Sequence, residues 1–378
     1  SRKIKEGDTF IALKMPCHDG HQYIEDAIQK GAKTIICEHG NYSVKTIIVP
    51  DTQKYLKEYC YQTYYPQIKD LKLIGITGTS GKTTTCYFLY QFLKQFQKKV
   101  AYIGTLGFYI DEKIKDLANT TPTVDEMYAL CIEAKKAGCE YVVMEVSSHA
   151  LAFDRIYQLK FDAVGFTNLS REHMDYHKTM ENYVKEKQKL FTYLRNDKIA
   201  VINEDDFYAS HFIKEGNQNI FFGKHGKNAK IIDYKAEIEG SLLTFSYKEK
   251  IYDVTLPFFG DYNAYNYLMS LLILDALHFP MGNLIEFTTN LKTPPGRMEA
   301  IINQTNLIFI DYAHKPGAVQ KVLETVEKQK KNKLYTILGC GGNQEITKRK
   351  MMGKIASEHS DFVFFTNDNP RDEDPKKI

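Results

Sequence analysis

The residues with the clearest chemistry form one glycine-rich turn, Gly75-Ile-Thr-Gly-Thr-Ser-Gly-Lys-Thr-Thr84, between an apolar run and an amphipathic stretch. A strand, a glycine loop and a helix in this order make an anion cradle, because backbone N–H groups and the helix N-terminus favour phosphate. In such a loop Lys82 would reach the outer phosphates, and the hydroxyl of Thr83 would be a ligand for Mg²⁺. The turn therefore predicts a nucleotide site, although Ile76 stands where the usual motif has its first glycine. A plain glycine turn is the alternative.

Glu145 lies near the end of an apolar run, Tyr141 to Val146, that is typical of a strand buried in a parallel sheet. If this strand runs beside the phosphate loop, the carboxylate faces Thr83 and could hold Mg²⁺. A strand-end glutamate in a salt bridge is the alternative. Because burying a carboxylate among apolar neighbours is costly without a cation, the pattern favours the metal site.

Two further polar stretches are ambiguous on their own. His173 and His177 are four residues apart and would share one face of a helix, but no glutamate of a HExxH zinc site separates them. A surface pair is therefore at least as good an interpretation as a ligand pair. Lys187 belongs to a lysine-rich segment that, taken alone, indicates a solvated helix face.

Composition excludes several classes of function. The chain is 43% hydrophobic and 26% charged, and its net charge of +3 is too small to argue for a nucleic-acid partner. It has no apolar stretch long enough for a membrane span and no apolar signal core at its start. Its seven cysteines show no CxxC spacing, which indicates reduced thiols. We therefore predict a cytoplasmic protein.

The elements that must position these residues alternate along the chain, which predicts an α/β fold. Residues 1–70 indicate a small α/β unit, and residues 71–296 a central unit with a parallel sheet. Residues 293–297, Thr-Pro-Pro-Gly-Arg, interrupt any helix or central strand and mark the next boundary. Residues 297–378 hold three more apolar runs and indicate a doubly wound sheet. This last segment is shorter than a typical domain of about 100–150 residues. We expect the chain to be cut short there, and to begin partway into its first unit.

Six motifs occur in order and together resemble the Mur ligases, most closely the branch that adds the third peptide residue to UDP-N-acetylmuramoyl-L-Ala-D-Glu. They are Gly75-Ile-Thr-Gly-Thr-Ser-Gly-Lys-Thr-Thr, Thr120-Thr-Pro, Met144-Glu-Val-Ser-Ser-His, Thr167-Asn-Leu-Ser-Arg-Glu-His-Met-Asp-Tyr-His, Gly296-Arg-Met-Glu and Asp311-Tyr-Ala-His-Lys-Pro-Gly-Ala. The resemblance implies a UDP-binding N-terminal domain, a central ATP-binding domain and a C-terminal Rossmann-like domain that binds the amino acid. It also implies a monomer that takes small-molecule substrates.

The resemblance implies an ATP-dependent amide ligase. The D-Glu carboxylate would attack the γ-phosphate to form an acyl phosphate, and the amine of the incoming amino acid would then displace phosphate. Lys82, Lys187 and His173 would serve catalysis, with Lys187 carbamylated by CO₂. Thr83 and Glu145 would hold one Mg²⁺, His173 would help to hold a second, and the carbamate of Lys187 would ligate or position the metal.

The same resemblance assigns the remaining contacts. The ATP-binding residues would be Gly78, Thr79, Ser80, Gly81, Lys82, Thr83, Thr84, Asn266, Arg297 and Asp311. The UDP-muramoyl-peptide would be bound by Ser1, Thr120, Thr121, Ser147 and Arg155.

Asp368-Asn-Pro-Arg371 resembles the family's signature for meso-diaminopimelate, so we expect Asp368, Asn369, Pro370 and Arg371 to bind the amino acid. An arginine can clamp the distal carboxylate, which L-lysine lacks. Gln344 stands where relatives have an arginine that also contacts the amino acid. An L-lysine-adding ligase, a relative with another acceptor, and a nucleotide-binding module without ligase activity are the alternatives.

Overall fold

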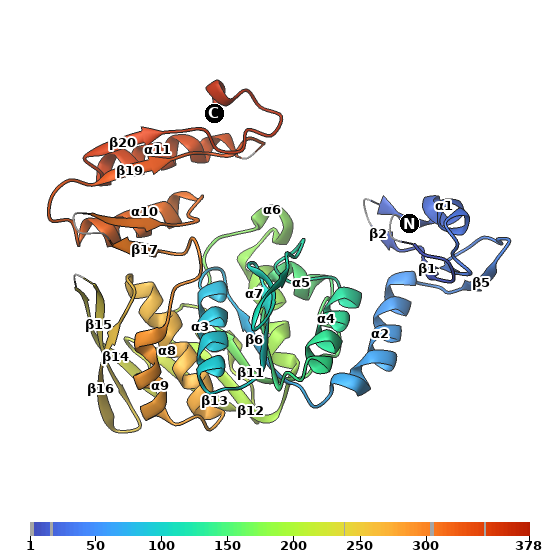
Figure 1. The fold of residues 1–378 in the computed structure, drawn as a ribbon, viewed down its shortest axis with the longest axis horizontal. Coiled ribbons are helices and arrows are strands. Elements are labelled where there is room, and N and C mark those ends of the chain that lie inside the picture. The colour runs from blue at the N-terminus through green and yellow to red at the C-terminus, as the bar shows by residue number, and fades with distance from the viewer. Residues whose placement is uncertain (1–3, 16–17, 238, 303–305, 344) are drawn as a thin grey trace.

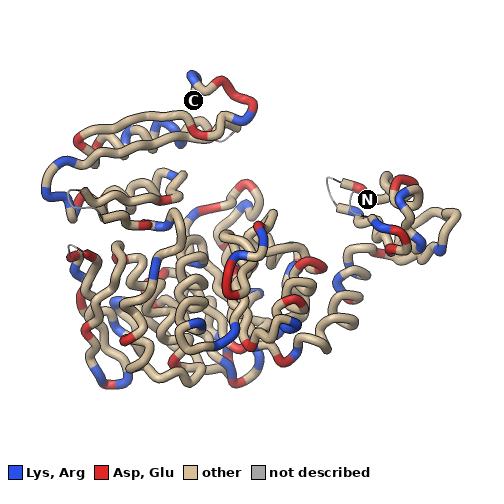
Figure 2. Tube along the Cα trace, viewed as in Figure 1, with Lys and Arg blue, Asp and Glu red and all other residues tan. Residues whose placement is uncertain are grey.

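The computed structural model describes residues 4–15, 18–237, 239–302, 306–343 and 345–378. Ser1 and Gln344 lie outside this part of the chain. Figure 1 shows a large central unit with a small N-terminal unit at one end and a C-terminal unit above the opposite end. Basic and acidic residues are interspersed along the chain in all three units, as Figure 2 shows.

The N-terminal unit is a three-stranded parallel sheet in the order β1-β4-β5. A long helix, α2, leads from it to the central sheet (Figure 1). The Asp51 carboxylate caps this helix by accepting the backbone N–H of Lys54 at 2.9 Å. The elements are β1 Thr9–Ile11, β2 Lys14–Met15, β3 His18–Asp19, η1 Gly20–Tyr23, α1 Ile24–Gln29, β4 Thr34–Cys37, β5 Lys45–Ile48 and α2 Thr52–Ile68.

The central unit is built on one eleven-stranded sheet in the order β16-β15-β14-β13-β12-β11-β6-β10-β7-β8-β9. Strands β7, β10, β6, β11, β12 and β13 are mutually parallel, so their C-terminal ends meet at one edge. The strands are β6 Lys72–Thr77, β7 Val100–Gly104, β8 Gly107–Ile110, β9 Glu112–Lys115, β10 Tyr141–Glu145, β11 Phe161–Phe166, β12 Leu194–Asn203, β13 Gln218–Gly223, β14 Ala229–Glu237, β15 Gly240–Tyr247 and β16 Lys250–Leu256.

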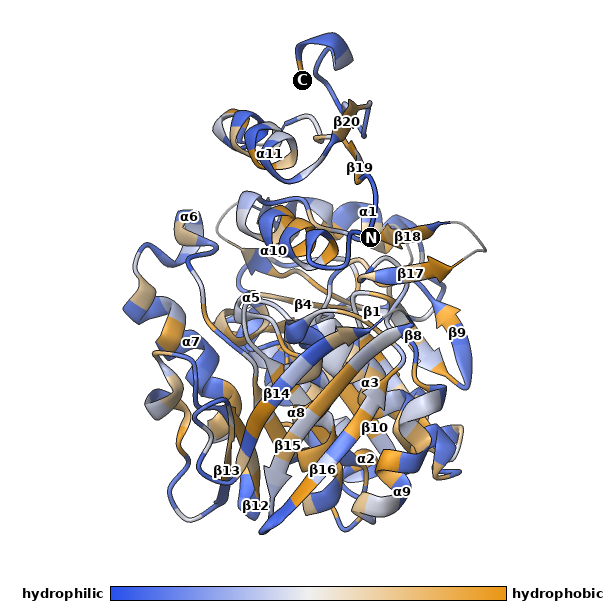
Figure 3. Cartoon of the chain, turned by 90° about the vertical axis from the view of Figure 1, so that its left-hand side faces the viewer, coloured by the Kyte–Doolittle hydropathy of each residue, from blue (hydrophilic) through white to orange (hydrophobic). Residues whose placement is uncertain are grey.

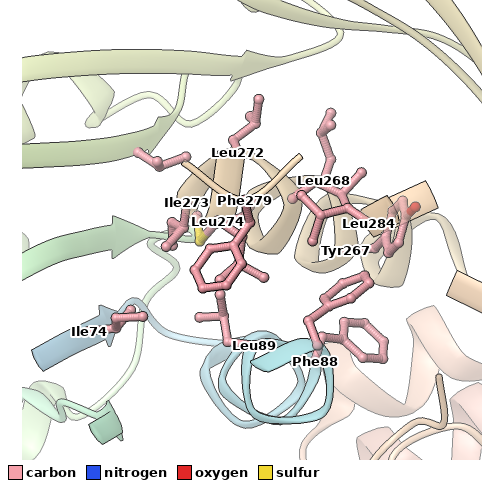
Figure 4. Close-up of a cluster of buried hydrophobic side chains, with 14 of the residues drawn as sticks. Ile74, Phe88, Leu89, Tyr267, Leu268, Leu272, Ile273, Leu274, Phe279 and Leu284 are labelled. Atoms are coloured by element: carbon pink, nitrogen blue, oxygen red, sulfur yellow. The ribbon is translucent and has the colours of Figure 1, made fainter. Parts of the chain in front are cut away.

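Two hydrophobic cores cover the faces of this sheet. On one face, α3 and α8 pack together over Ile74 and its neighbours, as Figure 4 shows. On the other face, side chains of α2, α4 and α7 pack on Leu73 and Val142. The central helices are α3 Lys82–Gln95, α4 Val124–Lys136, α5 Ser148–Ala152, α6 Met174–His177, α7 Met180–Thr192, η2 Ala209–Phe212, α8 Asp261–Ala276, α9 Met281–Phe287 and η3 Thr288–Asn290.

Strands β14, β15 and β16 pair in an antiparallel arrangement at one end of the central sheet. They join the parallel strands through a short parallel contact between β13 and β14. Figure 3 shows the three strands side by side with mixed hydropathy along each.

The C-terminal segment differs from the single doubly wound sheet that its apolar runs predict. Within the described residues, β17 pairs with β18 in an antiparallel ladder, and β19 pairs with β20 in a parallel one. The antiparallel pair forms because only a short connection separates the end of β17 at Ile302 from the start of β18 at Leu307. Apolar side chains of these strands remain exposed, Ile337 by 74% and Phe365 by 65%. The elements are β17 Glu299–Ile302, β18 Leu307–Ile310, α10 Pro316–Glu327, β19 Tyr335–Leu338, α11 Ile346–His359, β20 Phe362–Phe365 and η4 Pro375–Lys377.

We expect the substitution Phe212→Ala to lower the free energy of unfolding by about 3–5 kcal/mol. Phe212 is fully buried, and its ring stacks on Phe166 of β11 at 3.8 Å between centroids and contacts Phe191 of α7. Urea denaturation of the variant measures the loss. Phe207→Ala is the matched control, because that ring is 89% exposed and its removal should change stability little. Equal effects of the two substitutions would contradict the prediction.

Candidate functional site

The glycine loop lies between β6 and α3, at the edge where the parallel strands end. Gly78 and Gly81 have positive φ angles of 147° and 89°, which side chains other than glycine rarely adopt. A Cβ on Gly78 would lie 1.9 Å from the Thr167 hydroxyl, and one on Gly81 would lie 2.4 Å from Asn266 Oδ1. The loop is therefore closely packed against β11 and α8, and its glycines are required by that packing.

The residues after β11 fix the shape of the loop. The N–H of Thr79 donates to the Asn168 carbonyl at 2.8 Å, and the N–H of Ser80 donates to Asn168 Oδ1 at 3.1 Å. In return, Ser170 N–H donates to the Thr79 hydroxyl oxygen at 3.0 Å. The Tyr183 hydroxyl lies 3.2 Å from the same oxygen. Loop residues 78–81 are thus held open at the N-terminus of α3, the geometry expected of an anion cradle.

Two lysine ammoniums meet beneath the loop. Lys82 donates to the carbonyls of Gly78 and Thr79, both at 2.9 Å, and Lys187 donates to the same Gly78 carbonyl at 2.8 Å. Burial lowers the pKa of Lys187 well below its usual value, and the charge of Lys82 lowers it further. Lys187 is only 1% exposed, so the interpretation of its segment as a wholly solvated helix face is wrong at this position. Its carbonyl partner and its place on the inner side of α7 turn it toward the phosphate loop.

Glu145 ends β10, directly beside β6, and is 1% exposed. Its carboxylate accepts hydrogen bonds from the Thr83 hydroxyl at 2.8 Å, the Tyr102 hydroxyl at 2.7 Å and the Thr105 N–H at 2.8 Å. The described residues place no lysine, arginine or histidine in an ion pair with it, so the salt-bridge interpretation is not supported. A buried carboxylate next to a phosphate-loop hydroxyl is the donor set that Mg²⁺ uses together with phosphate oxygens and water. The two side chains present therefore fit this ion.

A cluster of hydroxyl groups lies next to the end of β10. Thr121 donates to the Glu145 carbonyl at 2.8 Å and accepts the Ser147 N–H at 3.1 Å. Arg155 donates to the Thr121 carbonyl at 2.8 Å, and the Thr120 hydroxyl lies 3.1 Å from that of Thr105. Four of the residues that were expected to contact the muramoyl-peptide are thus brought together beside the carboxylate.

His173 and His177 do not form a ligand pair on one helix. His173 precedes the single turn α6 with a positive φ of 56°, whereas His177 ends that turn and is buried, 3.0 Å from the Ser148 hydroxyl. Both rings pack on His149. Burial lowers the pKa of His173, and the charges of Lys187 and Lys82 lower it further. In the described part of the chain, no three His, Cys, Asp or Glu side chains are grouped as a metal site.

Asn266, Arg297 and Asp311 approach from elements that follow the central sheet. Asn266 is on α8, beside Gly81, and its Oδ1 lies 3.4 Å from the Thr85 hydroxyl. Asp311 accepts the backbone N–H groups of Met298 and Ala313, and its burial raises its pKa. The Arg297 guanidinium lies over the Tyr312 ring, 4.8 Å from its centroid. Burial lowers the pKa of Lys82, and the charge of Arg297 lowers it further.

The segment from Asp368 to Arg371 forms a turn after β20 that docks on the loop after β19. Arg371 donates to the Gly342 carbonyl, and Gly342 N–H donates to the Asn369 carbonyl at 2.9 Å. The turn that was expected to bind the amino acid therefore packs against Gly342, whereas Gln344 lies outside the described residues. Asp368 lines a cavity of about 280 Å³ together with residues of α11, whereas Arg371 is not among its lining residues.

Several residues of the site were not predicted. Tyr102 and Thr105 complete the shell of Glu145, and Asn168 and Tyr183 hold the phosphate loop. Asn168 follows an apolar strand, which is a usable signal for a site residue. Tyr102 lies inside an apolar strand and carries no such signal.

Comparison with known proteins matches the chain to two family models. Residues 76–274 match the Mur ligase middle domain, and residues 296–378 match the Mur ligase glutamate ligase domain. Two curated relatives are named UDP-N-acetylmuramoyl-L-alanyl-D-glutamate–2,6-diaminopimelate ligase. The protein of Aquifex aeolicus is 40% identical over all of this chain and 78% of its own length, and that of Clostridium perfringens is 38% identical over all of this chain and 80% of its own.

Solved structures share the fold. A solved structure of a UDP-N-acetylmuramoyl-L-alanyl-D-glutamate–2,6-diaminopimelate ligase superposes with a TM-score of 0.76 at 29% identity, covering 100% of this chain and 79% of that one. A MurF ligase from Thermotoga maritima in complex with ADP superposes with a TM-score of 0.71 at 21% identity, covering 96% of this chain and 82% of the other. The expected α/β fold class is confirmed by these superpositions.

Proposed function

Because the chain belongs to the Mur ligase family, we propose that it is the ATP-dependent ligase that adds meso-diaminopimelate to UDP-N-acetylmuramoyl-L-Ala-D-Glu. The relatives that span the whole chain carry this name. The proposal rests on one observation, that Lys82, Glu145 and Lys187 lie around the same phosphate loop. These residues provide the charge neutralisation that a reaction between two anions requires. The bound nucleotide and the acceptor carboxylate repel each other until cations neutralise them.

Phosphoryl transfer would take place at the loop. The D-Glu carboxylate oxygen bonds to the γ-phosphorus of ATP while the bond to the leaving ADP oxygen breaks, which gives an acyl phosphate. Lys82 and the loop N–H groups counter the charge of the transferring group. The amine of the amino acid then attacks the acyl carbon, phosphate leaves with the electron pair of the C–O bond, and the amine loses a proton. The Thr120, Thr121, Ser147 and Arg155 cluster lies where it would hold the acceptor peptide near Glu145.

Mg²⁺ would be held by Thr83 and Glu145, and it would draw charge from the phosphate oxygens when bound. The hydroxyl of Thr83 already lies 2.8 Å from the Glu145 carboxylate, so little rearrangement is needed to present both oxygens to one ion. Tyr102 and Thr105 keep the carboxylate oriented. We further propose that His173 assists at a second metal position.

We propose that Lys187 is carbamylated. Its amine is fully enclosed and donates to one backbone carbonyl, and no carboxylate of the described residues is paired with it. Addition of the amine to CO₂ forms a C–N bond and releases one proton, which gives a carbamate anion. That anion would lie beside Lys82, since both ammoniums share the Gly78 carbonyl. The change would convert a repulsive pair of cations into an attractive ion pair.

The amino acid would be chosen by the turn from Asp368 to Arg371. We expect Arg371→Ala to lower the preference for meso-diaminopimelate over L-lysine about tenfold or more, because a charge-assisted bond to the distal carboxylate is lost. The ratio of kcat/KM for the two amino acids measures this preference. Lys376→Ala, an exposed cation of the same segment, is the control. An unchanged ratio in Arg371→Ala would remove Arg371 from the recognition of that carboxylate.

The proposed function is tested with UDP-N-acetylmuramoyl-L-Ala-D-Glu, ATP and Mg²⁺, and with either meso-diaminopimelate or L-lysine as the second substrate. Release of phosphate together with a lengthened nucleotide product in the presence of meso-diaminopimelate alone is the expected result. Product with L-lysine would retain the ligase and overturn the selectivity. ATP binding without product from either amino acid would support a nucleotide-binding module instead.

We place the reaction in the cytoplasm and expect the protein to act as a monomer. The cysteines of the described residues are all free, as is usual in a reducing compartment. No helix in the described ranges has the length and apolar character that crossing a membrane requires.

A further inference from the structure

An ion pair joins the C-terminal segment to the loop that follows β11. Lys315, the residue before α10, pairs with the carboxylate of Glu172. The same Glu172 oxygen is 3.7 Å from His173 Nε2. Two residues earlier, Ser170 N–H is bonded to the Thr79 hydroxyl of the phosphate loop. The pair therefore holds the start of α10 next to the nucleotide site.

The ammonium of Lys315 also lies within the electrostatic field of the phosphate loop. Burial lowers the pKa of Lys315, and the charges of Lys82 and Lys348 lower it further. Arg297, from the same C-terminal segment, acts on Lys82 in the same way. Two cations of this segment thus oppose the positive charge of the loop lysine, and the ion pair with Glu172 fixes the position of one of them. Such a gathering of positive charge is unfavourable until an anion binds between the cations.

The Lys315 side chain has the freedom to change partners. It is 42% exposed, whereas the Glu172 side chain is 18% exposed. The long aliphatic stem of lysine allows its ammonium to move without displacing the backbone. Glu172 lies beside His173, a second group close enough to share its carboxylate if the lysine leaves.

We propose that Lys315 is a further phosphate-binding residue, which leaves Glu172 when ATP binds and neutralises the γ-phosphoryl group. The identity of the acceptor in this proposal rests on the proposed function. The contact between Lys315 and the γ-phosphate does not depend on which acceptor is used. In the transfer step Lys315 moves no proton. It counters charge while the acceptor oxygen bonds to phosphorus and the bond to ADP breaks. Glu172 holds the ammonium in place before the nucleotide arrives.

The competing explanation is that the pair only ties the C-terminal segment to the loop. The two explanations differ in what they predict for Glu172. If the ion pair is only structural, removing either partner should lower the nucleotide affinity by the same amount. Removing both partners should lower it no further. If Lys315 binds phosphate, replacing Lys315 should lower the affinity for the γ-phosphate. Replacing Glu172 should then not lower it.

The experiment measures calorimetric affinities for ADP and for an ATP analogue whose γ-phosphate cannot be transferred, on the full chain. The variants are Lys315→Met, Glu172→Gln and the double substitution, with Lys321→Met as an exposed control on α10. We expect Lys315→Met to bind the analogue about tenfold more weakly while ADP affinity stays within about threefold. Glu172→Gln should bind ADP as the unaltered protein does and the analogue at least as tightly, because Lys315 then has no ion pair to leave, and the double variant should match Lys315→Met. Lys315→Arg should restore most of the affinity for the analogue.

Equal losses in Lys315→Met, Glu172→Gln and the double variant would overturn the proposal and leave a structural tie. Unchanged affinity of Lys315→Met for the analogue would also overturn it. In the ligase assay, Lys315→Met should lower kcat about 10²-fold. If the unaltered protein makes no product with any acceptor, the proposed function fails, while the difference between the analogue and ADP still decides the role of Lys315.

Discussion

Replacing Lys82 by methionine should lower the rate of ATP-dependent ligation by about 10³-fold or more. Lys82 begins α3, and its ammonium donates to the carbonyls of Gly78 and Thr79. It therefore lies on the inner side of the loop that would enclose the phosphates. Methionine has a side chain of similar length, and it removes both the charge that would neutralise the transferring group and the two hydrogen bonds to these carbonyls.

The fold should tolerate this substitution. Within the described residues Lys82 is paired with no carboxylate, so its removal leaves no buried carboxylate without a partner. The Gly78 carbonyl retains the hydrogen bond from Lys187. Thermal denaturation should therefore show a Tm close to that of the unaltered protein, and phosphate release measures the loss of activity. This separates a chemical defect from unfolding.

Lys94→Met is the matched control, since Lys94 lies on the same helix and its ammonium donates to the Asp111 carbonyl, away from the loop. Its rate should be close to that of the unaltered protein. Ligation by Lys82→Met at a near-normal rate would show that the phosphates bind elsewhere and would refute the assignment of the loop.

The phosphate loop was predictable because its information is local. A strand, three glycines and a lysine followed by hydroxyls specify a loop at a helix N-terminus without reference to the rest of the chain. The structure confirms the strand β6 and the helix α3 on either side of it. Glu145 was placed correctly beside the loop because parallel strands align their C-terminal ends.

The surroundings of Glu145 were not predictable in the same way. Tyr102 reaches the carboxylate only because β7 pairs with β10 on the side away from β6. That strand order is a property of the whole sheet, and no short pattern around Tyr102 reports it. The burial of Lys187 has the same origin, since it depends on how α7 packs under the loop. The lysine-rich composition of that helix indicates solvent on its other faces.

In the C-terminal segment, apolar runs predict the strands but not how the strands pair. Its three runs are strands, but their pattern does not specify partners, and Glu299–Ile302 adds a strand that was not predicted. Pairing is decided by the connection between strands. A short connection allows the antiparallel pair β17–β18, whereas α11 connects the parallel pair β19–β20.

Replacing Lys187 by alanine should abolish ligation, and short carboxylic acids such as formate or acetate should restore part of the activity. The substitution removes the amine that we propose to carry the carbamate and opens space beneath the Gly78 carbonyl. A small carboxylate entering this space would return a negative charge next to Lys82, whose ammonium shares that carbonyl. Rescue should saturate with acid concentration, as binding to one site requires.

Two controls make this result specific to the carbamate. Lys189→Ala removes a lysine of the same helix that is paired with Glu186, and it should retain activity without added acid. Lys82→Met should be inactive and should not respond to formate, because the missing charge there is positive.

Incorporation of ¹³C from labelled bicarbonate, followed by NMR, should give a carbamate signal in the unaltered protein and none in Lys187→Ala. Full activity of Lys187→Ala without added acid would refute the carbamate, because the charge beneath the loop would then have no part in the reaction.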